Sequence, residues 1–178
     1  MPNKSLLNKN ILFALLLVIT IVAGGWLINY FMSKSQSQIN TAENHRQVID
    51  QYFNTALAFM QKKQYQPAVH QWQQLLALNP EIAEAHVNLG FSLYELGKYA
   101  SAIESFNQAM DINSYQLNAY YGLAICYEKT GDIKAAIGAM RSFIHLSEKD
   151  DPFVRKAKAA LWEWESQLPK ADVKNQIK

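Results

Sequence analysis

Residues 49–150 repeat a pattern with a period of 34 residues, so that the units 49–82, 83–116 and 117–150 align without a gap. Small residues recur at the eighth and twentieth positions of each unit, and large residues recur at the eleventh and twenty-fourth. The small set is Ala56, Gly90, Ala124, Ala68, Ala102 and Ala136, and the large set is Phe59, Leu93, Tyr127, Trp72, Phe106 and Met140. Periods of about 20 to 50 residues are typical of arrays in which no unit buries its apolar face alone. The repeat therefore restricts the fold to stacked units of one kind.

The alternation of small and large residues resembles that of the tetratricopeptide repeat, which implies two antiparallel helices in each unit. A large side chain on one helix needs a small residue opposite it, because the two backbones must approach. Position eight of the first helix and position twenty of the second, such as Gly90 and Ala102, are the predicted crossing points. Gly97 and Gly131 stand where the first helix would end, since glycine adopts a left-handed conformation at little cost. Lys63 stands at the same position of the first unit, where we expect strain or a differently shaped turn.

This pattern resembles the tetratricopeptide repeat over roughly residues 49–150. The resemblance implies an all-α fold, a right-handed α-solenoid of three helix pairs. The proline near the end of the family's unit is present as Pro80, where the missing N–H costs little at the start of the next unit, but Ser114 and Glu148 replace it in the later units. The small residue at position 27 is kept only as Ala109, so we expect the third unit to bend or end differently.

A last helix is predicted over 151–168, with Pro152 in its first turn and Asp150 or Asp151 as its N-cap. A helical stripe of apolar residues would pack this capping helix on the third unit: Phe153, Ala157, Ala160, Leu161, Trp164 and Leu168. Trp162 lies off that stripe. Residues 169–178 are predicted to form a disordered tail.

An uncharged run over residues 11–32 predicts one transmembrane helix ahead of the repeats. At about 1.5 Å per residue the run reaches about 33 Å, enough for a hydrocarbon core of roughly 30 Å. Trp26 and Tyr30 lie near its end, where amphipathic rings favour the interface. The alternative is a cleaved signal peptide, with residues 11–23 as its apolar core and the small residues 23–25 at the cleavage site. The apolar run continues to Phe31, which favours the uncleaved anchor.

The charges around this run predict the orientation of the chain. Lys4 and Lys9 lie in the short segment 1–10, which would be a cytoplasmic tail. The repeats would then face the periplasm or an equivalent compartment, as in a single-pass inner-membrane protein of the bacterial type. Residues 33–48 are polar and lack apolar periodicity, so they are predicted as a linker that leads into the first helix.

No catalytic constellation is visible, and we expect no enzyme activity, no cofactor and no small-molecule substrate. The histidines have no spacing suited to a metal ion: His45, His70, His86 and His145. Cys126, the one cysteine, can form neither an intrachain disulfide nor a cysteine-based zinc site, and a small buried hydrophobe is the expected role. A net charge of +2 without a strongly basic segment argues against nucleic-acid binding.

The resemblance also implies a groove lined by the first helices of the units. Its implied residues are Phe53, Leu57, Glu84, Val87, Asn88, Phe91, Tyr94, Tyr121, Ile125 and Glu128. The centre is apolar and the fringe mostly acidic, so the expected partner is a protein segment with apolar anchors and some basic character. The basic residues with which family members hold the carboxylate of chaperone tails are missing, which disfavours such tails. The linker, the N-terminal part of the chain or a second copy are alternative occupants.

Two functions remain open from the sequence. The first is a membrane-anchored adaptor that acts as an assembly or scaffolding factor for a membrane or envelope complex. The second is a permanent accessory subunit with a structural role in a large membrane complex. Both functions follow from an architecture of one membrane anchor, one linker and one repeat domain without a visible catalytic site. They rest on an analogy with other proteins of this architecture at the level of the fold.

Overall fold

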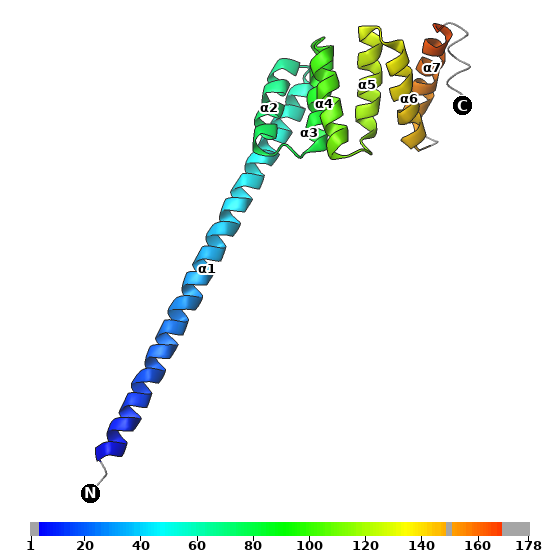
Figure 1. Ribbon diagram of the computed structural model, residues 1–178. Helices are drawn as coiled ribbons and strands as arrows, with labels where there is room; N and C mark the ends of the chain where they lie inside the picture. Colours follow the sequence, from blue (N-terminus) through cyan, green and yellow to red (C-terminus); the bar gives the residue numbers. More distant parts are fainter. Residues whose placement is uncertain (1–3, 149–150, 169–178) are drawn as a thin grey trace. The chain divides into compact units, whose positions relative to one another are not determined.

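The computed structural model describes the backbone of residues 4–148 and 151–168, and the side chains of Leu17, residues 20–148 and residues 151–168. All regular structure in these ranges is helical, which confirms the predicted all-α fold. The helices are α1 (Lys4–Gln61), α2 (Tyr65–Leu78), α3 (Ala83–Glu95), α4 (Tyr99–Ile112), α5 (Leu117–Thr130), α6 (Ile133–Leu146) and α7 (Pro152–Ser166) (Figure 1). The predicted tail, residues 169–178, lies outside the described residues.

The chain divides into two units, Met1–Val48 and Ile49–Lys178. The described part of the first unit is helical throughout, including residues 33–48, which were predicted as a polar linker that leads into the first helix. This segment contains neither glycine nor proline, and its polar side chains bond along the helix. Gln36 Nε2 donates to Asn40 Oδ1 at 3.0 Å, and Thr41 Oγ1 donates to the carbonyl of Ser37 at 2.9 Å. The polar side chains keep this segment exposed, but they do not interrupt the helix, because the segment contains no helix-breaking residue.

The predicted transmembrane segment lies only partly within the described side chains, which begin at Leu17 and Thr20. Over the residues that the structure covers, no helix has both the length and the apolar character needed to cross a membrane. The backbone of the segment is helical along its whole length, residues 11–32.

The second unit contains three helix pairs and a final helix. The first pair is the end of α1 with α2, the second is α3 with α4, and the third is α5 with α6 (Figure 1). Consecutive helices contact one another from α2 to α7, and α3 also contacts α5, so each repeat touches the next. Two buried clusters run through this stack, one centred on Trp72 and Phe106 and the other on Ile137 and Met140. A solenoid core of this kind is shared between neighbours and belongs to no single repeat.

The turn within each repeat closes on a residue in the left-handed conformation. Gly97 has φ +71° and Gly131 has φ +82°, as predicted from the sequence. Lys63 has φ +56°, although it is not glycine, so the first repeat keeps the turn geometry of the other two repeats at the cost of local strain. Between repeats, Asn79 and Asn113 recur one unit apart, and their side chains accept from the N–H groups of Glu81 and Tyr115.

Replacing Lys63 with glycine is expected to raise the free energy of unfolding by about 0.5 to 1 kcal/mol. Glycine adopts φ +56° without a clash between Cβ and the backbone, whereas lysine does not. Urea denaturation of the two proteins measures the difference. Lys62→Gly is the matched control, because Lys62 is also exposed but lies outside the left-handed region. Lys62→Gly should be neutral or destabilising, and equal stabilisation by both substitutions would contradict the strain at Lys63.

The packing between repeats depends on Phe106, which is fully buried. A Cβ added to Gly90 would lie 2.7 Å from Phe106 Cε1, and one added to Gly122 would lie 2.2 Å from Phe106 Cζ. The ring therefore occupies a notch made by a glycine of its own repeat and a glycine of the next. The sequence predicted Gly90 and Ala102 as the crossing points of the two helices, and the structure shows that Gly90 makes room for Phe106.

Helix α7 closes the described end of the stack. Asp151 caps it by accepting from the N–H of Phe153 at 2.7 Å, with Pro152 in the first turn, as predicted. Val154, Ala157 and Trp164 are buried against α6, but Phe153 is 59% exposed and does not belong to the packing stripe. Val154, the next residue in the same first turn, takes the buried position instead.

Candidate functional site

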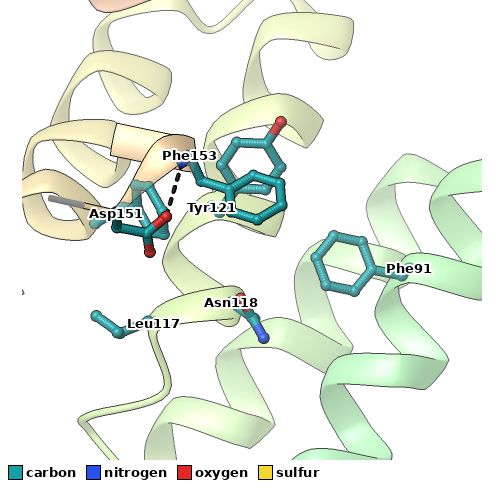
Figure 2. A pocket seen from close by; sticks show the side chains of 7 residues that line it. Phe91, Leu117, Asn118, Tyr121, Asp151 and Phe153 are labelled. Carbon is teal, nitrogen blue, oxygen red and sulfur yellow. Dashed lines mark hydrogen bonds between the residues drawn. The ribbon is translucent and has the colours of Figure 1, made fainter. Parts of the chain in front are cut away.

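A hollow of about 260 Å³ opens where the second and third repeats meet the capping helix. It is called the α5 hollow below, and its lining residues are Phe91, Leu117, Asn118, Tyr121, Phe143, Asp151 and Phe153 (Figure 2). Helix α3 contributes Phe91, α5 contributes three residues, and α6 contributes Phe143. The other two lie at the start of α7. Four of the seven side chains are aromatic, so the hollow is mainly an apolar site with a few polar groups.

The spacing of residues along α5 places three of them on one wall. Leu117, Asn118 and Tyr121 fall within the first two turns, and residues three and four apart share a helix face. Because α5 and α6 are antiparallel, the start of α5 lies beside the end of α6, which brings Phe143 to Tyr121. The short connection to α7 then returns the chain to the same end of the pair, so that Asp151 and Phe153 complete the site.

Buried rings hold the aromatic walls in place. Phe91 packs edge-on against Phe106 at 5.0 Å between ring centroids, and Tyr121 packs against Phe143 at 5.4 Å. Phe53 stands in the same relation to Trp72 in the first repeat, at 5.1 Å. Aromatic pairs with this geometry add about 0.5 to 1.5 kcal/mol beyond their buried area. The walls of the α5 hollow are therefore preformed in the absence of a partner.

The charges at the site are few. Among the described residues that line the hollow, Asp151 is the one charged side chain. One of its oxygens accepts the N–H of Phe153, which is the helix cap. Lys156 does not line the hollow, although its ammonium lies 5.8 Å from the centroid of the Phe153 ring. Further along α5, Lys129 pairs with Glu128 at 3.1 Å, and this carboxylate raises the pKa of Lys129.

The predicted groove residues occupy different environments, and the structure brings Phe91 and Tyr121 together in the α5 hollow. Val87 is only 4% exposed and packs in the core, so it offers no surface to a partner. Glu84 is exposed on the first turn of α3. The remaining predicted residues are half-buried along the first helices, and their part in a groove stays a prediction: Phe53, Leu57, Asn88, Tyr94, Ile125 and Glu128. Burial raises the pKa of the Tyr94 hydroxyl.

The sequence did not single out Asp151 and Phe153 as site residues. Both were assigned to the structure of the capping helix, one as its cap and the other in its packing stripe. Asp151 and Phe153 line the hollow only because the start of α7 lies beside the start of α5 in the folded chain. Asn118 carried a weak signal, because it occupies the same position in its unit as Glu84.

The groups that could have carried chemistry are occupied structurally. His86 is buried, and its Nε2 lies 2.9 Å from the carbonyl oxygen of Pro80. The described residues contain no cluster of His, Cys, Asp and Glu suited to a metal ion. Cys126 is fully buried, and burial raises the pKa of its thiol to about 12, as expected for a cysteine that acts as a small hydrophobe.

The Cys126 thiol is expected to react with a disulfide reagent at pH 8 at least about a thousandfold more slowly in the folded protein than in urea. A pKa raised from 9.0 to about 12 lowers the thiolate fraction by about that factor, and burial slows access further. Absorbance of the released thiol at each urea concentration measures the rates. Comparable rates in the folded and unfolded protein would contradict the burial of Cys126.

Comparisons with known proteins agree with the repeat pattern. Residues 81–142 match the family described as tetratricopeptide repeat, and residues 56–97 match one described as TPR repeat. The BBSome complex member BBS4 of Bos taurus is 24% identical over 143 residues, which are 76% of this chain and 28% of that protein. The chain thus spans less than a third of the length of this curated relative.

Solved structures share the fold. The TPR domain of Arabidopsis OM64 has a TM-score of 0.65 and 20% sequence identity, over 70% of this chain and 99% of that one. PcrH in complex with the chaperone binding region of PopD also has a TM-score of 0.65, with 19% identity over 68% of this chain and 94% of that one. These likenesses confirm the predicted architecture of helix pairs, whereas its right-handed sense stays a prediction.

Proposed function

We propose that residues 56–142, which match models of the tetratricopeptide repeat, hold a segment of a partner protein on the face formed by the first helices. In this proposal the protein is a membrane-anchored adaptor that serves as an assembly or scaffolding factor for a membrane or envelope complex. In this role the protein binds its partner and catalyses no reaction.

The observation that carries the proposal is the α5 hollow. Its aromatic walls are preformed, and Phe153 remains 59% exposed beside them. Covering such a surface with an apolar side chain releases about 25 cal/mol per Å² of buried area. A preformed site also avoids the cost of ordering its own side chains on binding. PcrH was solved with the chaperone binding region of PopD, which is a precedent for a bound protein segment on this fold.

Membrane anchoring through residues 11–32 is part of the same proposal and rests on their composition. The run carries no charge, and its described large apolar side chains are exposed, among them Trp26 at 68% and Phe31 at 63%. With Lys4 and Lys9 before the run, we propose that the N-terminus is cytoplasmic and the repeats lie in the periplasm.

An intact mass near 20.3 kDa in the membrane fraction is expected. A mass lower by about 2.5 kDa would mean a cleaved signal peptide instead.

Site-specific photocrosslinking from membranes tests the binding proposal. A photoreactive residue in place of Asn118, which is exposed at the α5 hollow, should give a discrete crosslinked product with one protein. The control is the same residue in place of Gln74, which is exposed on α2 and does not line the hollow. No product at 118, or the same product at 74, would overturn the proposal.

A permanent accessory subunit of a large membrane complex is the second candidate. BBS4 is named as a member of the BBSome complex, and this relative aligns over most of the chain. Stoichiometric co-purification in detergent that survives high salt would favour the subunit, whereas release of the partner by salt would favour the adaptor.

A further inference from the structure

The volume of the α5 hollow and the polar groups at its rim indicate which kind of side chain it would receive from the bound segment. We infer that it receives a large aromatic side chain, such as tryptophan, from a partner segment whose neighbouring residue is lysine or arginine, and that Asp151 pairs with that cation. This inference rests on the proposed function and specifies the partner of the same site. The hollow is built by residues of four helices and the cap of α7, all within the unit Ile49–Lys178.

Volume determines the kind of anchor. An apolar cavity of about 150 Å³ takes a benzene ring. The α5 hollow measures about 260 Å³, so it has room for a two-ring side chain. Its walls are the rings of Phe91, Tyr121 and Phe153, and aromatic rings contact one another favourably edge-on or offset (Figure 2). The amide of Asn118 lies at the same site and can accept an indole N–H.

The negative charge of Asp151 indicates which residue should stand next to the aromatic side chain in the partner segment. Asp151 uses one oxygen to cap α7, and a carboxylate can accept further hydrogen bonds at its second oxygen. Asp151 is also the one charged side chain among the described residues that line the hollow. The one cation of α5, Lys129, is already paired with Glu128. A partner that carries positive charge next to its anchor is therefore complementary to this face, and an acidic segment is not.

Asp151 can be tested without damage to the fold. Asparagine caps helices as well as aspartate does, so Asp151→Asn removes the charge and keeps a side-chain acceptor for the N–H of Phe153. Asn118→Trp would fill the hollow from an exposed position without removing any packed group. Trp162→Ala is the matched control, because Trp162 is 76% exposed on the same helix and does not line the hollow.

The experiment measures the binding of three fluorescein-labelled peptides to the full-length protein in a nonionic detergent, by fluorescence polarisation. The peptides carry Lys-Trp-Lys, Glu-Trp-Glu or Lys-Ala-Lys at their centre. Lys-Trp-Lys should bind at least about tenfold more tightly than Lys-Ala-Lys, because only tryptophan fills the hollow. It should bind about threefold more tightly than Glu-Trp-Glu, the size expected for a partly exposed ion pair.

The variants separate the two parts of the inference. Asp151→Asn should abolish the preference for lysine over glutamate and keep the preference for tryptophan over alanine. Asn118→Trp should abolish the preference for tryptophan, and Trp162→Ala should change neither preference. Equal binding of the tryptophan and alanine peptides, or a lysine preference that survives Asp151→Asn, would overturn the inference. If a crosslinked partner still forms at position 118, the proposed function stands although the inference fails.

Two other occupants have distinct outcomes in the same experiment. If removal of residues 169–178 tightens Lys-Trp-Lys binding about tenfold, the hollow is covered by that segment and not by a partner. If Phe153→Glu converts a dimer to a monomer in sedimentation, the occupant is a second copy of the chain. Unchanged affinity and unchanged mass in these two variants support the external partner.

Discussion

Replacement of Gly122 by alanine is expected to lower the free energy of unfolding by about 2 to 3 kcal/mol. The added Cβ would lie 2.2 Å from Phe106 Cζ and 2.4 Å from Cε1, inside the contact distance of any two carbon atoms. Phe106 is fully buried between α3 and α5 and packs on Phe91, so its ring has no open space into which to move. Overpacking of a close-packed core costs about 1 to 3 kcal/mol, and this overlap belongs at the upper end.

Urea denaturation followed by circular dichroism measures this cost, and Gly138→Ala is the matched control. Gly138 is also helical, but nothing lies within 4 Å of an added Cβ there. Alanine at that position should stabilise the protein by about 0.5 to 1 kcal/mol through helix propensity alone. A second substitution, Phe106→Leu, should recover part of the loss caused by Gly122→Ala. Equal effects of alanine at positions 122 and 138 would contradict the close approach of Phe106.

Trp72→Ala is expected to lower the free energy of unfolding still further, by about 3 to 5 kcal/mol. The indole is fully buried in the first core cluster, and Phe53 packs on it edge-on at 5.1 Å. Truncation would leave a cavity beneath Phe53 and remove the aromatic contact between α1 and α2. A loss of this size is a large part of the total of about 5 to 15 kcal/mol for a typical domain, so the first repeat should unfold before the others.

Two further variants identify the cause of that loss. Trp72→Phe keeps an aromatic ring and removes an indole N–H that has no hydrogen-bond partner among the described residues, so it should cost only about 1 kcal/mol. Trp162→Ala, at an indole that is 76% exposed, should change stability by less than about 0.5 kcal/mol. Thermal unfolding of the three variants side by side checks the order. A loss at Trp162 comparable to that at Trp72 would contradict the assigned core.

The repeat fold was predictable from the period of 34 residues, because units of the same kind bury side chains at equivalent positions where they stack. Local chemistry alone placed Gly97 and Gly131 in left-handed turns and Asp150 or Asp151 at a helix cap, and the structure shows both glycines with positive φ and Asp151 as the cap. Lys63 was expected to be strained or to change its turn, and it keeps the turn with a positive φ. Residues 33–48 were predicted as a polar linker, and their helical conformation was not predicted, because polar composition indicates exposure and does not distinguish an exposed helix from a coil.

The candidate site was predictable only where it coincided with the repeat. Phe91 and Tyr121 were found because repeat positions mark the face of the first helices. Val87 was assigned to the same face and shares it with Phe91, four residues further on, but Val87 packs in the core and is buried. Gly122 was not singled out, because the same position of the other units holds Asn54 and Asn88 and a residue that does not recur has no signal in a repeat.

The amino-acid sequence by itself determined the helices, the turns and the stacking order of this protein, because spacing, glycine positions and helix caps act within one repeat or between identical ones. The tertiary structure alone decided that Phe106 lies between Gly90 and Gly122, and that Asp151 and Phe153 meet Phe91 and Tyr121 around a hollow. Most of these contacts join residues from different repeats or from the non-repeating helix α7. Their positions depend on how the helices pack in space, and no periodic pattern in the chain specifies that packing.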